Sequence, residues 1–364
     1  MKNSFIMQMR PLFGEEEKKA ISNYMDEDGF ITEFKHTEKF ERMIAEYTGA
    51  KHCVVVNNGT ISLTLAAMAL GIKAGDEVIV PNYTMIATPN SVKMFGAVPV
   101  FVDVELETLC LDIEKVKKAL TPKTKAIMLV TANGRYPKAG IADFEELARS
   151  KQLLLIEDAA QSLGSFYPDD RHIGRAGVVG SFSFSAPKII STGQGGALIT
   201  DDDLVAANLR RLKDFGRSGG GNDIHDSIGY NFKFTELQAC IGIEQMKKLP
   251  ARVERKKAIW RRYANNLERV TGIQLFGHEL DYTSPWFIDS MVENREGLIA
   301  HMKAVGIGTR VMYPPINKQI AYQATGEYPI CNLIDVKGLW LPSAVQLTDE
   351  EIDRICKDIK DFYD

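Results

Sequence analysis

The first 200 residues alternate short apolar runs with stretches in which apolar residues recur at helical spacing. Helical stretches at residues 61–70, 113–120 and 142–151 separate several of the apolar runs. Near-continuous apolar strands between helices are typical of a mainly parallel sheet covered on both faces. We therefore predict an α/β fold with seven strands at residues 53–56, 77–80, 98–102, 125–130, 153–157, 179–185 and 197–200.

The pattern changes after Asp201, where longer helical stretches follow. Residues 204–215 and 235–249 predict two helices, the second of which begins at Thr235 as its N-cap. After Pro250, a basic helical stretch leads into a shorter α+β portion. We predict a large domain over residues 1–250 and a smaller C-terminal α+β domain over residues 251–364.

Two charged residues follow neighbouring apolar strands. Lys188 comes after the strand at 179–185 and precedes a glycine-rich turn, and Asp158 comes directly after the strand at 153–157. Ligands of parallel sheets collect at the carboxyl ends of the strands. A lysine and a carboxylate placed there suit pyridoxal phosphate, because the amine forms a Schiff base with it and the carboxylate keeps its ring nitrogen protonated. Considered without Lys188, Asp158 could equally be an ordinary exposed residue at the end of a strand.

Three further residue patterns fit the same cofactor but also have ordinary explanations. Gly59 and Thr60 open a helix after the first strand, so they could hold a phosphate, or could be a simple capped turn. Ser183 could add a hydroxyl to the phosphate, although serine–phenylalanine alternation also fits a half-buried strand. Gln161 could contact the phenolic oxygen of the ring, or be a satisfied loop residue. The usual dinucleotide and nucleoside-triphosphate motifs do not occur.

The composition narrows the class of protein. The 44 basic and 48 acidic residues give a net charge of −4, which offers no support for nucleic-acid or membrane-surface binding. Five widely spread cysteines without a CxxC pair favour a reducing compartment over a disulfide framework. The six histidines show no metal-ligand spacing, so we expect no metal site. Neither a signal peptide nor a membrane span is evident, so we predict a cytoplasmic location.

Taken together, these segments resemble the sugar-nucleotide aminotransferase family named after DegT, DnrJ, EryC1 and StrS. The resemblance implies fold type I of the pyridoxal phosphate enzymes, as in aspartate aminotransferase, and a homodimer with shared active sites. It also implies that glutamate donates an amino group, which pyridoxamine phosphate then passes to a nucleotide-linked keto sugar. The matching stretches are Asn58-Gly59-Thr60, residues 75–81, Glu157-Asp158-Ala159-Ala160-Gln161, residues 181–188 with 192–196, and Gly229-Tyr230-Asn231.

The resemblance also implies roles for individual residues. Lys188 would be the catalytic residue that binds the cofactor and moves protons, and Asn231 would arrive from the other subunit. Met85 stands where the family usually stacks an aromatic residue on the ring, with Tyr83 as the alternative. The implied cofactor contacts are Gly59, Thr60, Met85, Asp158, Gln161, Ser183, Lys188 and Asn231.

The substrate contacts are less closely specified. Arg135, Arg217 and Arg310 are candidates for the diphosphate or the donor carboxylate through the fork of the guanidinium, although each could be a surface arginine. Tyr313 lies in a segment where the family frequently has a histidine at the position of Asn317. This difference, together with Asn133 and its neighbours in place of a commoner His-Leu-Tyr-Gly segment, bears on the identity of the substrate.

Residues 9–12 and 29–33 resemble the 4-amino branch of the family, of the perosamine or viosamine type. We predict amination of a 4-keto-6-deoxyhexose nucleotide to a 4-amino-4,6-dideoxy sugar for cell-surface polysaccharide or O-antigen. One alternative is a 3-keto sugar-nucleotide aminotransferase, and another is a non-catalytic regulatory protein that binds the same cofactor. Lys188 argues against a related dehydratase that has histidine there. A lyase or desulfurase would need a cysteine in a mobile loop.

Overall fold

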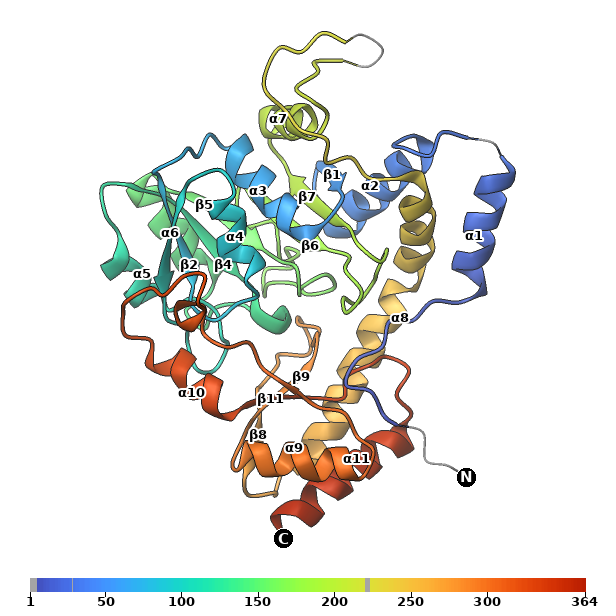
Figure 1. Ribbon diagram of the computed structural model, residues 1–364, viewed down its shortest axis with the longest axis vertical. Coiled ribbons are helices and arrows are strands. Elements are labelled where there is room, and N and C mark those ends of the chain that lie inside the picture. Colours follow the sequence, from blue (N-terminus) through green and yellow to red (C-terminus); the bar gives the residue numbers. More distant parts are fainter. Residues whose placement is uncertain (1–4, 28, 220–222) are drawn as a thin grey trace.

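The computed structural model describes residues 5–27, 29–219 and 223–364. Its large domain is built on a seven-stranded sheet of order β1-β7-β6-β5-β4-β2-β3 (Figure 1). β7 is antiparallel to both of its neighbours, and the other pairs are parallel. The predicted mainly parallel sheet is confirmed, with small shifts at the strand ends. The strands are β1 (His52–Val56), β2 (Glu77–Pro81), β3 (Val98–Val102), β4 (Thr124–Val130), β5 (Leu154–Asp158), β6 (Val179–Ser183) and β7 (Gly196–Thr200).

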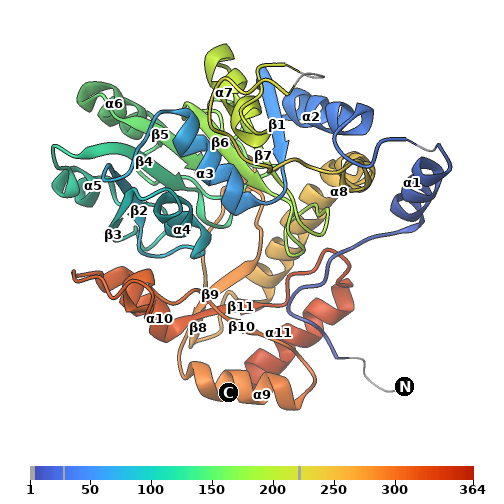
Figure 2. The same ribbon diagram turned by 45° about the horizontal axis from the view of Figure 1, so that its top comes forward.

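Helices cover both faces of this sheet, as a buried parallel sheet requires (Figures 1 and 2). One apolar core lies between the sheet and the helices α3 (Gly59–Ala69), α4 (Ala87–Lys93) and α7 (Asp203–Lys213). A second core lies on the opposite face, where the helices are α2 (Lys35–Thr48), α5 (Ile113–Ala119), α6 (Ile141–Lys151) and the first part of α8 (Glu236–Leu267). α1 (Glu15–Asp26) packs against α8 from outside.

The helix α8 connects the two domains without a break. The sequence predicted separate helices on either side of Pro250, but the structure has one helix of 32 residues with Pro250 inside it. A proline lacks the N–H that would bond four residues back, yet burial of the apolar side chains along α8 holds the helix together. Thr235 is the N-cap, as predicted, and accepts a hydrogen bond from the Gln238 amide at 3.3 Å. The domain division at residue 250 stays a prediction.

The small domain contains a four-stranded antiparallel sheet of order β10-β11-β9-β8. Residues 5–10, which we assigned to the large domain, pack here: the Ile6 amide donates to the Gly306 carbonyl at 2.9 Å. The elements are β8 (Ile273–Leu275), β9 (Ile288–Val292), α9 (Arg295–Ala304), β10 (Arg310–Val311), α10 (Pro329–Lys337), β11 (Gly338–Leu341) and α11 (Asp349–Tyr363), with a short 3-10 turn at Ile316–Lys318; a second such turn, Ala132–Gly134, follows β4 in the large domain. None of the helices in the described ranges combines the length and apolar character needed to cross a membrane.

Candidate active site

Lys188 and Asp158 lie together at the carboxyl end of the sheet. β5 ends at Asp158 and pairs with β6, so that Asp158 stands opposite Ser181. The chain leaves β6 and turns at Ser185, whose carbonyl accepts a hydrogen bond from the Lys188 amide at 3.0 Å. The Lys188 side chain is half-buried and close enough to Asp158 for each charge to shift the pKa of the other.

Burial changes the protonation of both groups. It lowers the pKa of Lys188 to about 8, although the Asp158 carboxylate acts in the opposite direction. Burial raises the pKa of Asp158, against hydrogen bonds from Thr88 and the Ala160 amide and the charge of Lys188. A lysine with such a pKa has an appreciable fraction of free amine near neutral pH, which nucleophilic attack and proton transfer require.

Two residues that the sequence did not single out complete the surroundings of this pair. The Thr88 hydroxyl of α4 donates a hydrogen bond to Asp158 Oδ2 at 2.7 Å. The Trp286 ring lies over Lys188, with the ring centroid 4.3 Å from Nζ, and its indole N–H donates to the Pro187 carbonyl at 2.7 Å. Nothing in the sequence pattern marks Trp286.

The N-terminus of α3 lies directly against the end of β6. A Cβ on Gly59 would lie 2.8 Å from Ser183 Cβ, and a Cβ on Gly196 would lie 2.5 Å from the Asn58 carbonyl oxygen. Glycine at both positions therefore permits the close approach. The approach follows from the register of the sheet, which pairs Gly196 with Val56 on one side and with Ser183 on the other.

This approach creates a site suited to a phosphate group. The Asn58 side chain caps the helix by accepting a hydrogen bond from the Ile61 amide at 3.0 Å. The first amides of the helix, those of Gly59 and Thr60, have no acceptor within it. These amides and the Ser183 hydroxyl meet at a positive helix end, where an anion is stabilised. The predicted phosphate contacts are thus brought together, and their roles toward the cofactor stay a prediction.

Gln161 is oriented by a backbone contact. Its side-chain oxygen accepts a hydrogen bond from the Asn133 amide at 2.6 Å. The Asn133 side chain in turn pairs with the Phe287 backbone, donating to its carbonyl at 2.9 Å and accepting from its amide at 2.6 Å. Asn133 therefore connects the large domain to the segment that carries Trp286. Among the described residues no acceptor is paired with the side-chain nitrogen of Gln161, which can therefore donate to an acceptor such as a phenolic oxygen.

Met85 and Tyr83, the two candidates for stacking on the ring, differ in burial. Met85 lies two residues before α4 and is 45% exposed, whereas Tyr83 is buried and packs near Tyr313, with ring centroids 6.1 Å apart. The exposure of Met85 leaves it free to contact a ligand. Its stacking on the cofactor stays a prediction.

Tyr313 and Arg310 lie on the small-domain side of the same site. Burial raises the pKa of Tyr313 to about 12, with Arg310 lowering it and the Asp158 charge raising it. Tyr313 is therefore within electrostatic reach of both residues. The Arg310 guanidinium lies over Trp340, 5.4 Å from the ring centroid, is exposed, and has no salt-bridge partner in the part of the chain that the structure describes. It is the predicted arginine best placed to bind an anion here.

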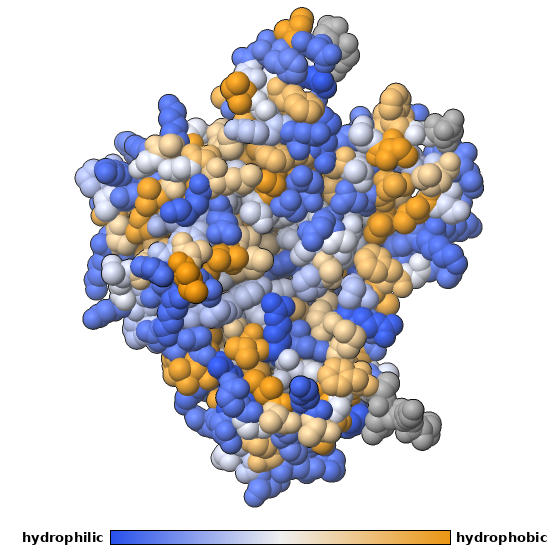
Figure 3. Space-filling view, in the orientation of Figure 1, coloured by the Kyte–Doolittle hydropathy of each residue, from blue (hydrophilic) through white to orange (hydrophobic). Residues whose placement is uncertain are grey.

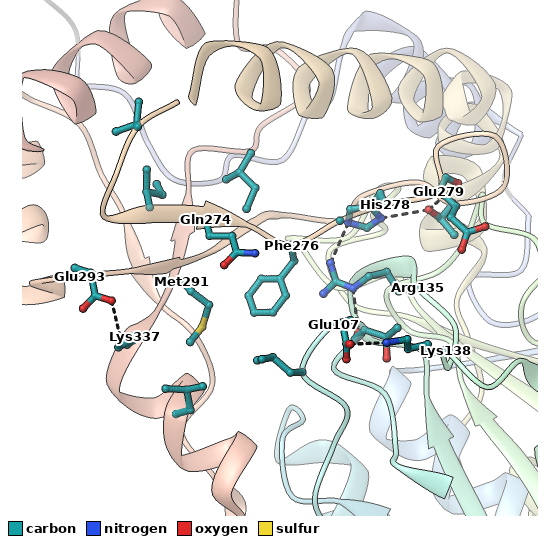
Figure 4. A pocket seen from close by; sticks show the side chains of 18 of the residues that line it. Glu107, Arg135, Lys138, Gln274, Phe276, His278, Glu279, Met291, Glu293 and Lys337 are labelled. Carbon is teal, nitrogen blue, oxygen red and sulfur yellow. Dashed lines mark hydrogen bonds and ion pairs between the residues drawn. The ribbon is translucent and has the colours of Figure 1, made fainter. Parts of the chain in front are cut away.

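The other two arginines are engaged elsewhere. Arg135 is buried, and its guanidinium forms a salt bridge with Asp289 and contacts His278, so it is not free to bind a substrate carboxylate. It lines a cavity of about 1000 Å³ between the domains, which includes neither Lys188 nor Asp158 (Figure 4). Arg217 follows α7 and pairs with Asp214 and Asp223. We therefore keep only Arg310 and Tyr313 in the proposed substrate site.

Asn231 lies on the segment that returns from the loop after α7 to α8. Its neighbour Phe232 accepts a hydrogen bond from the Asn57 amide at 3.2 Å, close to the start of α3. Asn231 itself is exposed. Residues 216–219 and 223–228, which precede it, project from the large domain at the top of Figure 1.

The sequence profile of the DegT/DnrJ/EryC1/StrS aminotransferase family matches residues 11–360. The GDP-perosamine synthase of Escherichia coli O157:H7 is 32% identical over 363 residues, covering 99% of each chain. The GDP-perosamine synthase of Caulobacter vibrioides is 34% identical over 351 residues and covers 93% of each. Among solved structures, Spr1654 of Streptococcus pneumoniae, determined in a PLP form and a PMP form, has a TM-score of 0.92 at 26% identity, covering 99% of this chain and 98% of that chain.

Proposed function

Because the chain belongs to the DegT/DnrJ/EryC1/StrS aminotransferase family, we propose that it transfers an amino group from glutamate to a nucleotide-linked 4-keto-6-deoxyhexose. Membership confirms the predicted fold type, the predicted aminotransferase class, and pyridoxal phosphate as the cofactor that aminotransferases of this family use. The 4-keto substrate is supported by the similarity to GDP-perosamine synthases over nearly the whole chain. The observation that carries the proposal is the Lys188–Asp158 pair beside the phosphate site at Gly59 and Ser183.

We assign a different role to each residue of the site. Pyridoxal phosphate supplies an aldehyde that takes up an amino group and a ring that accepts electrons when bound. Lys188 Nζ would hold the cofactor through its aldehyde carbon. Once the incoming amine has replaced it there, the freed Lys188 amine would move a proton to and from the carbon that loses or gains the amino group. Asp158 would hold a proton at the ring nitrogen, with its carboxylate oriented by Thr88. Gly59, Thr60 and Ser183 would bind the phosphate.

On the substrate side, Arg310 would bind an anionic group, either the carboxylate of glutamate or the diphosphate of the sugar nucleotide. A guanidinium forms two parallel hydrogen bonds with either group. Tyr313 lies close to Arg310, and its hydroxyl is protonated at neutral pH, as an ordinary tyrosine hydroxyl is; burial raises its pKa further, to about 12. Its hydroxyl is therefore a hydrogen-bond donor for the substrate.

The reaction is tested by incubating the purified protein with glutamate and a panel of GDP-, UDP- and dTDP-linked 4-keto and 3-keto sugars. We expect a new amine at ring position 4, located by NMR of the product, with the Lys188→Ala variant as the inactive control. Amination at position 3 would support the alternative substrate class. If every sugar is left unchanged, the proposed reaction is wrong.

The visible absorbance of the purified protein distinguishes the aminotransferase from the non-catalytic alternative. A bound aldehyde cofactor absorbs visible light, and glutamate should remove that absorbance as the amine is taken up. Colour that glutamate leaves unchanged would favour the regulatory protein or another donor. No observation favours a desulfurase, since all five cysteines are buried and burial raises the pKa of each thiol.

We propose a homodimer in which Asn231 contacts the cofactor of the partner subunit. Asn231 is exposed, and large apolar side chains are exposed at Ile228 and Tyr230 in the same segment. Others, Met25, Phe30, Ile31 and Phe34, gather over the connection between α1 and α2 (Figure 3). Exposed apolar patches of this kind commonly mark interfaces.

The proposed dimer is tested by measuring the mass of the protein in solution. Analytical ultracentrifugation of the wild-type protein at micromolar concentration should give twice the mass of the chain. Replacing Phe30 and Ile31 together with aspartate should shift the protein toward the monomer, because two charges would be buried in the interface. A wild-type monomer that binds the cofactor and transfers amine would reject the shared site.

A further inference from the structure

Trp286 links the small domain to the Pro187–Lys188 pair. Its side chain is only 3% exposed and lies just before β9. The indole N–H holds the Pro187 carbonyl at 2.7 Å, and the ring covers the Lys188 amine at 4.3 Å from the centroid. Pro187 and Lys188 follow β6 of the large domain, so a residue of one domain covers the reactive amine of the other.

A second lysine lies behind Trp286. Lys256 of α8 is 1% exposed, and its ammonium donates hydrogen bonds to the backbone carbonyls of Trp286 and Ser343. No carboxylate lies within salt-bridge distance of it in the described residues. Burial accordingly lowers the pKa of Lys256 to about 7. A buried amine without a counter-charge costs free energy, so fold stability alone gives no reason for a lysine here.

The partners of Lys256 indicate what it does. Trp286 and Ser343 belong to separate segments of the small domain, and the Ser343 hydroxyl accepts a hydrogen bond from the Ile288 amide at 2.8 Å, at the start of β9. Lys256 therefore ties the backbone of Trp286 to α8, the helix shared by both domains. This contact sets the position from which the indole reaches Lys188.

We propose that Trp286 is a further active-site residue that keeps water from the Lys188 amine, and that Lys256 is the residue that positions it. The inference rests on the proposed role of Lys188 as the residue that binds the cofactor. It concerns the chemistry of the amine alone and requires neither the sugar nor glutamate.

The indole has two opposing effects on the amine. Attraction between an ammonium and a ring face favours the charged form, whereas exclusion of water disfavours it. A ring contact to a desolvated ammonium is worth about 1.5 pKa units, while full burial of an amine lowers its pKa by about 3–5 units. Water exclusion therefore dominates, and removal of the indole should raise the pKa of Lys188.

The test measures this pKa directly in the full-length chain after removal of the cofactor. Lysines are labelled briefly with acetic anhydride over a range of pH, and the peptide that contains Lys188 is quantified by mass spectrometry. Trp286→Ala should raise the pKa of Lys188 by about one unit and increase its limiting labelling rate. Trp260→Ala is the matched control, since the Trp260 indole donates to the Phe276 carbonyl at 3.2 Å within the small domain. An unchanged pKa in the Trp286 variant overturns the proposal.

A double-mutant cycle tests the positioning role of Lys256. Lys256→Met should raise the pKa of Lys188 in the wild-type background but add nothing in the Trp286→Ala background, because it acts through the indole. A full additional shift there would overturn the role of Lys256. Should Lys256→Met fail to fold by circular dichroism, Lys256→Gln keeps a donor for one carbonyl and takes its place in the cycle.

This experiment separates two kinds of failure. If no sugar is aminated but the pKa of Lys188 responds as expected, the proposed reaction is wrong. The inference that Trp286 excludes water from the Lys188 amine is then still supported. If the sugar is aminated and the pKa is unchanged, only the inference about Trp286 and Lys256 is lost.

Discussion

Replacing Lys188 with alanine is expected to lower kcat for amine transfer by about 10³- to 10⁴-fold or more. In the proposed mechanism the amine provides both the covalent attachment of the cofactor and the proton transfers, and Asp158, whose charge acts on Lys188, is needed at the ring. Single-turnover kinetics with the keto sugar measure the loss. Borohydride reduction followed by mass spectrometry should find no cofactor attached to the variant chain.

Lys188→Arg is the matched control, because it keeps the positive charge but a guanidinium does not bond the aldehyde. We expect it to be as inactive as the alanine variant. Activity within about tenfold of wild type in either variant would show that another group carries the chemistry.

Replacing Asp158 with asparagine is expected to lower kcat by about 10²- to 10³-fold, as for loss of one preorganised electrostatic contact. The amide is neutral and does not hold a proton at the ring nitrogen. The same change should lower the pKa of Lys188, since the Asp158 charge now raises it. Steady-state kinetics at saturating glutamate measure the first effect, and a variant as fast as wild type would contradict the assignment.

The Asp158→Asn change, which is expected to lower kcat, should not lower the stability of the fold at pH 7. Burial raises the folded-state pKa of Asp158, so the folded state binds more protons than the unfolded state just above pH 3.8. The free energy of unfolding therefore falls as pH rises through this window, and the ionised Asp158 costs stability at pH 7. The melting temperature of cofactor-free Asp158→Asn at pH 7 should equal or exceed that of wild type.

Asp103 is the matched control, because its effect on stability should have the opposite sign. Its surface is also largely buried, but hydrogen bonds from Cys331 and Lys115 outweigh the effect of burial and hold its pKa below the usual value. Its stabilisation is present above pH 3.8 and is lost as pH falls through the lowered pKa. Asp103→Asn should therefore lower the melting temperature at pH 7. Equal effects at both positions would show that the environments do not differ as described.

The sequence determined the scaffold and the placement of Lys188 near Asp158. Apolar runs and helical periodicity are local properties, so they predicted all seven strands of the large sheet and its mainly parallel order. The position at which a strand ends is also a local property of the sequence. The carboxyl ends of parallel strands lie at the same edge of the sheet, so residues that follow them lie close together. The sequence alone therefore places Lys188 and Asp158 together. A cytoplasmic location and the domain division at residue 250 stay predictions from the same source.

Only the tertiary structure decided which side chains are free to act. Arg135 and Arg310 look alike in the sequence, yet Arg135 is paired with Asp289 in the interior and Arg310 is exposed beside Tyr313. Trp286 reaches Lys188 across the boundary between the domains. Such contacts depend on how distant segments pack, and no spacing along the chain encodes them, because burial and partners are set by neighbours in space rather than in sequence.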